Sequence, residues 1–298
     1  MSRVSKSEAD LPRPISMTRR RALKTLFCSS AVLALNIRES GAAPPLAAEG
    51  VHLLAIGDYG TTGEYQVKVA AAMRAYVERA SLRPEGLLML GDNFYSAVKG
   101  GFTTSSERWR SGFEEMYPAS HFPGKCWAIL GNHDYHDNHG GELVQLDYAR
   151  QTGTRWTMPA KWYRVDLGGP QPVLTILALD SNLPSVSGGK NAKTGEPRGS
   201  LTAEESEQQL AWLRNELSRP RGTFTLVIGH HPLYSNGSHG DTRRLVESWG
   251  PLFEEHGVHA YLCGHDHDLQ HLELEGLRTS FVISGGGGAR TRALKSER

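Results

Sequence analysis

The stretch Leu87-Leu88-Met89-Leu90-Gly91-Asp92-Asn93-Phe94-Tyr95 decides how this chain is interpreted. Its first four residues form a continuous apolar run, which predicts a buried strand. The run ends at Gly91, where the backbone can bend sharply, and a carboxylate, an amide and a phenol follow the bend. A strand that leads directly into such a turn indicates a ligand site at the strand's carboxyl end.

Four other apolar runs end in the same kind of turn. These turns are Gly57-Asp58-Tyr59-Gly60, Gly131-Asn132-His133-Asp134, Gly229-His230-His231-Pro232 and Gly264-His265-Asp266-His267. Each turn alone is compatible with an ordinary structural role, because Gly-Asp and Gly-Asn pairs are common turn formers. The carboxyl ends of strands in an α/β sheet form the ligand crevice, so we expect all five turns to converge on one place.

Short apolar runs recur from residue 51 onward and predict a series of buried strands. They cover residues 51–56, 87–90, 126–130, 162–167, 173–179, 223–228, 260–263 and 281–284. Helical patterns lie between several of them: one spans residues 203–217 after a capping box of Thr202 and Glu205, and another spans residues 66–78. Strands that alternate with helices indicate an α/β fold.

Residues 183–200 are rich in Ser, Gly, Lys and Pro and show no periodicity, which predicts a long surface loop. Long loops beside active sites often act as lids, and a plain insertion fits the sequence equally well. We expect the walls of a substrate pocket to come from this loop and from residues 97–111.

The composition excludes several classes of protein. With 39% hydrophobic and 22% charged residues, the chain can build a core, and its formal net charge of +1 gives no sign of a nucleic-acid partner. Three cysteines exclude a small scaffold held by disulfides. Cys126 and Cys263 fall in predicted strands, where a buried free thiol is the favoured interpretation and a disulfide between them is the alternative.

Residues 1–48 differ from the rest and look like an export leader. Basic residues 19–21 precede an apolar run at 26–35, which is shorter than the roughly 20 residues of a membrane-spanning helix. Small residues at 41–43 and 46–48 suit a signal peptidase. The arginine pair resembles a twin-arginine leader, which carries folded proteins out of the bacterial cytoplasm, and a disordered tail is the alternative. We expect a leader at 1–48, one domain at 49–298, and a periplasmic or secreted protein.

The donors in the five turns predict two metal ions. Two carboxylates, an amide, three imidazoles and a phenol exceed the four ligands of one zinc ion, and the turns offer no cysteine. In His265-x-His267 both side chains point the same way if the segment is extended, so this turn can serve both ions. Asp92 and Tyr95 could share one ion. The remaining histidines are interpreted as surface or packing residues: His52, His121, His136, His139, His256, His259 and His271.

At these motifs the sequence resembles the calcineurin-like metallophosphoesterases and, within them, the purple acid phosphatases of the small tartrate-resistant type. The distinguishing features are Tyr95, Asn132 and the run Cys263-Gly264-His265-Asp266-His267-Asp268-Leu269-Gln270. The likeness covers roughly residues 51–288. It implies a four-layer α/β/β/α sandwich of two mixed β-sheets flanked by helices, with residues 49–298 as the catalytic domain.

The resemblance also implies a metal centre with assigned ligands. The ligands of a ferric ion would be Asp58, Asp92, Tyr95 and His267. Those of a second, divalent ion (iron, zinc or manganese) would be Asp92, Asn132, His230 and His265. Asp92 would bridge the two ions, and His133 and His239 would be the catalytic histidines. His231 is a competing donor, but the spacing of His230 to His239 fits the family.

The activity implied is that of an acid phosphatase, in which a metal-bound hydroxide attacks the phosphorus of a phosphate monoester. The substrates would be small esters or phosphoproteins. The alternatives are a phosphodiesterase or pyrophosphatase on the same centre, and a protein that binds metal or phosphate and whose hydrolysis is vestigial. We expect a monomer with no nucleic-acid partner and no stable membrane anchor after leader removal.

Overall fold

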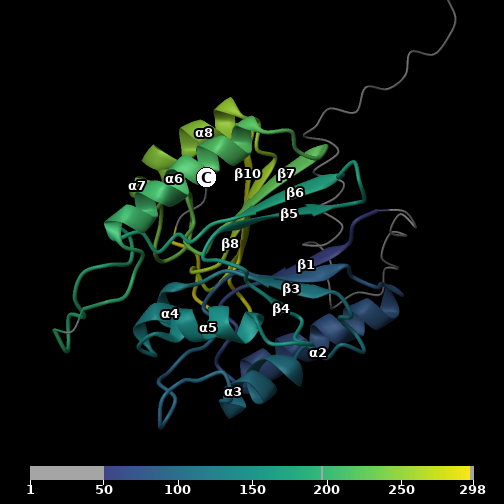
Figure 1. Ribbon diagram of the computed structural model, residues 1–298, viewed down its shortest axis with the longest axis vertical. Coiled ribbons are helices and arrows are strands. Elements are labelled where there is room, and N and C mark those ends of the chain that lie inside the picture. The colour runs from purple at the N-terminus through teal and green to yellow at the C-terminus, as the bar shows by residue number, and fades with distance from the viewer. Residues whose placement is uncertain (1–49, 196, 296–298) are drawn as a thin grey trace, which may run out of the picture. The chain divides into compact units, whose positions relative to one another are not determined.

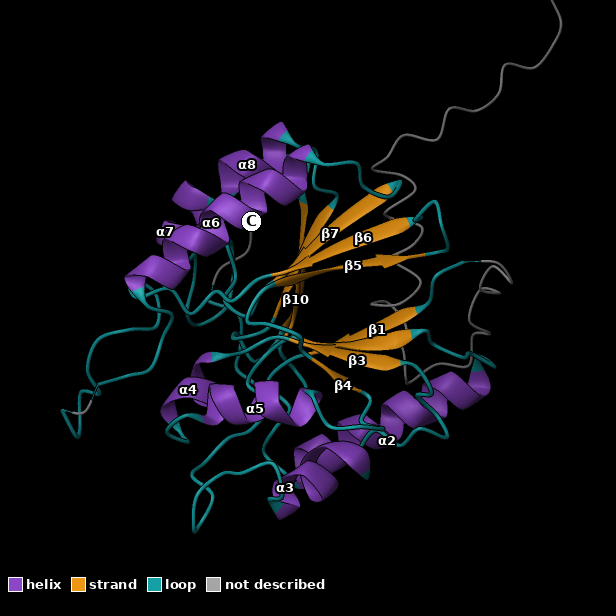
Figure 2. Ribbon diagram, in the orientation of Figure 1, coloured by secondary structure: helices purple, strands orange, loops and turns teal. Residues whose placement is uncertain are grey.

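The computed structural model describes residues 50–195 and 197–295. In this part of the chain two β-sheets face each other and helices cover the outer side of each (Figures 1 and 2). This is the expected α/β/β/α arrangement. The leader expected at residues 1–48 lies outside the described residues.

The first sheet has four strands and is wholly parallel. Its strands, in spatial order, are β1 (Leu53–Ile56), β2 (Gly86–Met89), β3 (Lys125–Ala128) and β4 (Trp156–Thr157). The expected mixed pairing is therefore absent from this sheet, because the chain returns by a crossover before β2, β3 and β4. Every residue of β2 is buried, as a parallel strand covered on both faces requires. The two residues of β4 are too few to give a periodic signal.

Helices and one π-helical segment lie on the outer side of the first sheet (Figure 2). They are α2 (Glu64–Arg79), α3 (Glu107–Trp109), η1 (Arg110–Glu114), α4 (Asn132–His136) and α5 (Gly141–Ala149). The helix predicted at 66–78 is α2. Helix α4 begins at Asn132, directly at the end of the apolar run that contains β3.

The second sheet has six strands and is mixed, as expected. In spatial order they are β5 (Tyr163–Leu167), β6 (Leu174–Ala178), β7 (Phe224–Ile228), β8 (Ala260–Cys263), β10 (Ser280–Ser284) and β9 (Leu269–Leu272). The edge strands β5 and β9 are antiparallel to their neighbours. The sequence did not predict β9, whose residues alternate in burial and form no continuous apolar run.

The outer side of the second sheet carries α6 (Ala203–Ser218), α7 (Arg243–Ser248) and α8 (Gly250–Glu255). The predicted capping box of α6 is present: the Thr202 hydroxyl accepts from Glu205 N at 3.0 Å, and the Glu205 carboxylate accepts from Thr202 N at 2.8 Å. Leu213 and Leu217 are fully buried beneath this helix. The helix therefore begins and packs as its sequence pattern predicts.

Hydrogen bonds join the two sheets. The Tyr163 hydroxyl of β5 donates to the Ala128 carbonyl of β3 at 2.8 Å. The Ser284 hydroxyl of β10 donates to the Ala55 carbonyl of β1 at 3.1 Å. These bonds place the strand ends of one sheet beside those of the other. Cys126 and Cys263 are buried free thiols, which confirms the favoured interpretation.

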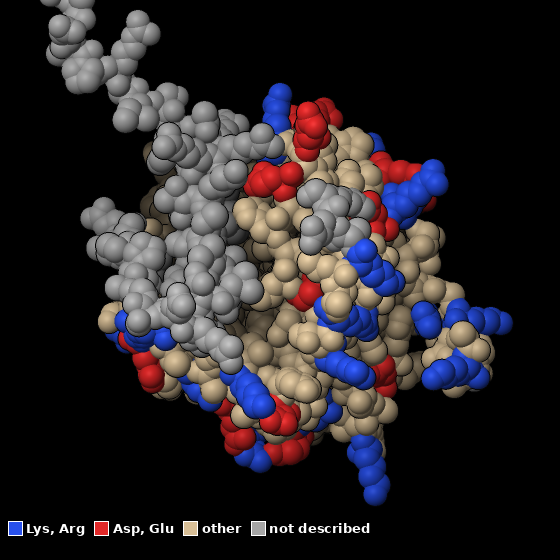
Figure 3. Space-filling model, turned by 180° about the vertical axis from the view of Figure 1, so that it is seen from behind, with Lys and Arg blue, Asp and Glu red and all other residues tan. Residues whose placement is uncertain are grey.

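The segment 183–200 is a loop, as predicted. Its described part contains a single β-bridge, between Lys190 and Pro197, and no helix. The loop projects at the right of Figure 3, and basic side chains gather on it. Among the residues that the structure describes, no helix has the length and apolar character needed to cross a membrane.

Candidate metal centre

The five turns meet at the carboxyl ends of β1, β2, β3, β7 and β8. Backbone hydrogen bonds join turn to turn: Asp58 N donates to Gly91 O at 3.1 Å, and Gly264 N donates to His230 O at 3.0 Å. The parallel strands β1, β2 and β3 bring their turns to one edge, and the second sheet adds two more. The structure therefore brings all of the predicted ligands together.

Three of these predicted ligands have a left-handed backbone. The φ angles are 57° at Asp58, 52° at Asp92 and 69° at His265. A non-glycine residue rarely adopts this conformation, and such strained positions cluster at functional sites. Each of the three residues lies in the turn that follows its strand, β1, β2 or β8.

Four side chains form what we call the first cluster. It consists of Asp58, Asp92, Tyr95 and His267. Ligand atoms of Asp58, Asp92 and His267 all lie within 4.8 Å of one another. The Tyr95 hydroxyl lies 2.9 Å from Asp92 Oδ2, 3.2 Å from Asp58 Oδ1 and 3.3 Å from His267 Nε2. The four donors thus surround one point.

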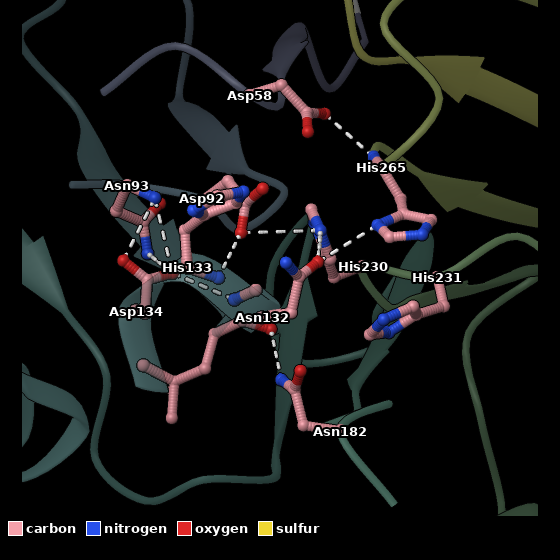
Figure 4. A network of polar contacts seen from close by, with 12 residues as sticks. Asp58, Asp92, Asn93, Asn132, His133, Asp134, Asn182, His230, His231 and His265 are labelled. Carbon is pink, nitrogen blue, oxygen red and sulfur yellow. Dashed lines mark hydrogen bonds and ion pairs between the residues drawn. The ribbon is translucent and has the colours of Figure 1, made fainter. Parts of the chain in front are cut away.

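The second cluster shares Asp92 with the first, and all of its residues are labelled in Figure 4. It consists of Asp92, Asn132, His230 and His265. His230 Nε2 lies 3.4 Å from Asp92 Oδ1 and 3.2 Å from Asn132 Oδ1, and His265 Nδ1 lies 3.0 Å from the same Asn132 oxygen. Asp92 faces the first cluster with Oδ2 and the second with Oδ1. Its carboxylate is therefore shaped to bridge two ions.

Backbone carbonyls orient two of the imidazoles. His230 Nδ1 lies 2.9 Å from Leu90 O, and His267 Nδ1 lies 3.0 Å from Arg290 O. A carbonyl only accepts, so each ring carries a proton on Nδ1 and turns Nε2 to the centre when neutral. This is the tautomer that a metal ligand on Nε2 requires.

His231 is held in a different way. The Ser181 hydroxyl accepts from the backbone N–H groups of His230 and His231 and lies 2.8 Å from His231 Nδ1. Because two N–H groups already donate to this oxygen, its own proton is directed to His231 Nδ1, and the neutral ring protonates on Nε2. The geometry therefore supports His230 over His231 as the ligand.

The electrostatics of the first cluster fit a bound cation. Burial, followed by the charges of Asp92 and Asp58, raises the pKa of the Tyr95 phenol far above its usual value. Burial also raises the pKa of Asp58. Burial acts on Asp92 in the same direction, but the charges and hydrogen bonds of His230 and His133 together outweigh it and hold the pKa of Asp92 well below its usual value, so neighbouring positive charge is what keeps this carboxylate ionised. The donors are carboxylate, amide, imidazole and phenol without thiolate, a set that suits iron, zinc or manganese.

Asp134 organises the centre, and the sequence analysis gave it no role. This fully buried carboxylate accepts from Gly131 N at 2.8 Å, Asn93 N at 3.0 Å and Gln145 Nε2 at 2.8 Å. It thereby joins the turn after β2 to the turn after β3. Burial and the charge of Asp92 raise the pKa of Asp134 to about 7. Asp134 lies in the first turn of α4, where an acidic side chain commonly caps the helix, and this sequence pattern could have identified it.

His133 lies beside the shared carboxylate. Its backbone N–H donates to Asp92 Oδ1 at 2.9 Å, and its Nδ1 lies 3.0 Å from both carboxylate oxygens of Asp137. Burial lowers the pKa of His133, but the Asp137 hydrogen bond and the Asp92 charge outweigh it, so the pKa is raised. Asp137, one helical turn later, was not singled out from the sequence.

His239 is an exposed residue in an otherwise largely buried loop after β7. The buried Asp266 carboxylate accepts from His239 N at 2.9 Å and from the Ser238 hydroxyl at 3.2 Å. The His239 ring centroid is 4.2 Å from that of His265, and Arg292 contacts its Nε2. Asp266, which the sequence placed among the metal-binding turns, thus holds the His239 loop.

A cavity of about 660 Å³ opens beside the second cluster. It is lined by residues of the second cluster, by His239, by the 183–200 loop and by residues 241–247. No residue of 97–111 is among those that line this cavity, contrary to expectation, and Phe102 and Trp109 are buried against the aromatic core around Phe94. His136, interpreted as a surface or packing residue, also lines the cavity.

An α/β/β/α sandwich with two adjoining ligand clusters at its strand ends defines a metallophosphoesterase. The sequence profile of the calcineurin-like phosphoesterase family matches residues 51–269, and the chain belongs to this family. It is 30% identical to tartrate-resistant acid phosphatase type 5 of Mus musculus, over 83% of this chain and 76% of that protein. It is 31% identical to the Homo sapiens protein of the same name, over 83% and 74%.

A plant relative and two solved structures extend the comparison. Purple acid phosphatase 17 of Arabidopsis thaliana is 29% identical, over 80% of this chain and 68% of that protein. GAP50, the anchor in the inner membrane complex of Plasmodium, has a TM-score of 0.67 at 18% identity, over 83% and 75%. Purple acid phosphatase PPD1 of yellow lupin has a TM-score of 0.56 at 15% identity, over 85% and 47%. The predicted resemblance is confirmed, and the two structures share the fold.

Proposed function

We propose that this protein is a binuclear metal-dependent acid phosphatase that hydrolyses phosphate monoesters. The observation that carries the proposal is Asp92, whose two oxygens face two adjoining clusters of buried donors. When bound, two metal ions would lower the pKa of a water molecule and neutralise charge on the phosphoryl oxygens. The tartrate-resistant and purple acid phosphatases named above support the same activity.

The two clusters differ in charge, which supports different metals. The first cluster has two carboxylates and a phenol, and phenolate is a hard anionic donor suited to a ferric ion. The second cluster has the shared carboxylate, an amide and two imidazoles, so its donors suit a divalent ion of iron, zinc or manganese. We assign Fe(III) to the first cluster and the divalent ion to the second.

His133 and His239 handle protons and phosphoryl oxygens. Asp137 holds the His133 ring and keeps its pKa raised, so His133 is protonated at mildly acid pH. His239 lines the cavity next to the second cluster. Burial lowers the pKa of His239, so the imidazole that stays protonated at mildly acid pH is His133, which can donate to the leaving oxygen of the ester when its bond to phosphorus breaks. An acid pH optimum follows.

Hydrolysis of a monoester and of a diester by the purified metal-loaded protein tests the reaction. We expect p-nitrophenyl phosphate to be cleaved faster than bis(p-nitrophenyl) phosphate, with an optimum below pH 7. A diester preference would reassign the protein as a phosphodiesterase, for which the cavity of about 660 Å³ leaves room. No hydrolysis would favour the alternative of a protein that binds metal or phosphate.

His239→Ala separates catalysis from metal binding. Because the ring lies outside both clusters, the variant should retain its metals while kcat falls by about 10². His256→Ala, which removes an imidazole elsewhere, is the matched control and should keep full activity. Equal kcat in His239→Ala and the unchanged protein would remove His239 from the mechanism.

The proposed location and partners rest on the sequence. Residues 1–48 resemble a twin-arginine leader, so we propose export to the periplasm or medium and a monomer that acts on small phosphate esters or phosphoproteins. On the face in Figure 3, basic and acidic side chains are interspersed outside the grey atoms, which supports a protein with no nucleic-acid partner. Replacing Arg19, Arg20 and Arg21 with lysine should leave the protein in the cytoplasm; unchanged export would contradict the twin-arginine route.

A further inference from the structure

The cavity beside the second cluster has a basic wall. We define this wall by three residues: Arg198 of the 183–200 loop, and Arg243 and Arg244 at the start of α7. Two carboxylates, Asp241 and Glu247, line the same cavity, so the arginines outnumber the acidic groups by one. The same cavity is lined by Asn132, His265 and His239 of the metal centre. A substrate whose phosphate lies at the second cluster therefore extends its leaving group into a space shared with three guanidinium groups.

The three arginines are not equally engaged. Arg243 Nε donates to the Glu247 carboxylate at 2.7 Å, so its charge is already compensated. Among residues 50–195 and 197–295, no carboxylate forms an ion pair with Arg198 or Arg244, and both are exposed. Among the described residues the cavity thus offers two guanidinium groups from separate parts of the fold without a carboxylate partner, against one further carboxylate, Asp241, which accepts from Ser235 N at 3.0 Å.

The volume of the cavity limits which anion the two arginines can bind. A volume of about 660 Å³ lies well within the range of cavities that enclose whole small-molecule ligands, roughly 300–1,000 Å³. The phosphate that reacts must lie against the metal ligands, so it leaves the basic wall unused. Guanidinium groups bind carboxylate and phosphate with paired hydrogen bonds, and they bind neutral sugars or alcohols less strongly.

We propose that the substrates of this protein are phosphate monoesters whose leaving group carries a second oxyanion, a phosphate or a carboxylate, which Arg198 and Arg244 bind. The inference rests on the proposed phosphatase function and narrows its substrate class. The loop and α7 act as one specificity surface, because each supplies one unpaired arginine to the same cavity.

Matched pairs of substrates test the inference on the metal-loaded, full-length protein. Glucose 6-phosphate and 6-phosphogluconate release the same kind of primary alkoxide, but only the second carries a carboxylate. Fructose 6-phosphate and fructose 1,6-bisphosphate differ by a second phosphate. We expect kcat/KM to be about tenfold higher for the doubly anionic member, because one charge-assisted hydrogen bond contributes about that factor to binding. The pair with the larger ratio identifies the oxyanion that is preferred.

The double variant Arg198→Gln/Arg244→Gln should lower the ratio of kcat/KM between the two members of a pair to about 1 or 2. Arg83→Gln removes the same charge at a separate hollow lined by Val77, Glu78 and Pro123, so it is the matched control and should keep the ratio. Higher salt should reduce the ratio in the unchanged protein, because exposed charges are screened.

Two outcomes overturn the inference in distinguishable ways. If the unchanged protein hydrolyses both members of each pair at equal kcat/KM, the substrate class is wrong, and if the double variant keeps the full ratio, Arg198 and Arg244 do not bind the second oxyanion; in either case the inference fails and the phosphatase function stands. If the metal-loaded protein hydrolyses none of the four compounds and no p-nitrophenyl phosphate, the proposed function itself fails and this inference fails with it.

Discussion

The metal-binding turns and the cavity wall beside them are built in different ways. The turns follow buried strands, and Asp58 and Asp92 are almost completely inaccessible to solvent. The basic wall comes from a long loop and from α7, and its arginines are exposed. A strand end holds the side chains that follow it in closely defined positions, whereas the sequence of a loop can change without disturbing the sheets. The chemistry of the protein is therefore set by its sheets and its selectivity by its loops.

Asp92→Asn should have the largest effect, because Asp92 belongs to both clusters. We expect loss of both ions and a fall in kcat/KM of at least about 10³, which corresponds to several kcal/mol of transition-state stabilisation. Metal content and kcat/KM are the measurements. Asp147→Asn, at an exposed site of α5, is the control and should bind metal normally. A fully metal-loaded, active Asp92→Asn protein would refute the shared role.

Gly131→Ala tests how closely the turn after β3 must approach the turn after β2. A Cβ atom at this position would lie 2.2 Å from Asp92 N and Asp92 Oδ1. The two turns must separate to admit it, and displacements of about 1 Å in an active site can cost about 10² in rate. We expect a loss of kcat of that order.

Gly250→Ala is the control for this prediction, because nothing lies within 4 Å of the added atom. If Gly131→Ala and Gly250→Ala had the same activity, the contact between the two turns would not limit the geometry of the centre.

Asp137→Asn should change the pH profile. The Asp137 carboxylate raises the pKa of His133, so the variant should lose the His133 proton at lower pH. A group with a raised pKa is protonated below that pKa, so the fall in kcat/KM on the alkaline side should move to lower pH. We expect about a tenfold loss at neutral pH and a smaller loss at acid pH. A uniform loss across the whole pH range would show that Asp137 only supports the fold.

Thr202→Ala should have the smallest effect on activity, since the α6 cap is remote from the metal ligands. The variant loses the hydroxyl that accepts from Glu205 N. We expect about 1 kcal/mol lower stability, or about 2–4 °C in Tm, with kcat unchanged. Thermal unfolding and kcat measure both quantities. A large change in kcat would contradict the separation of scaffold and site.

The sequence predicted the metal turns well for a physical reason. Asp92 and Tyr95 follow a continuous apolar strand, and parallel strands deliver their carboxyl ends to one edge without further information. Asp134, Asp137 and Asp266 could not be assigned in this way. Each acts on a partner from another turn or one helical turn away, and such pairing appears only once the chain is folded.

The cavity wall was the hardest part to predict. Residues 97–111 and 183–200 both look like polar loops in the sequence, but Phe102 and Trp109 pack into the core while Arg198 lines the cavity. Which loop reaches the site depends on how the helices pack against the sheets. Neither segment contains a local sequence pattern that indicates which of the two reaches the site.

Metal analysis together with the visible spectrum of the purified protein tests the central claim most directly. The two clusters predict about two metal ions per chain, one of them iron, and a broad visible absorption band from the Tyr95 phenolate. Tyr95→Phe should lose this band. A colourless protein, a single metal ion, or a band that persists in Tyr95→Phe would contradict the assignment of a ferric ion to the first cluster.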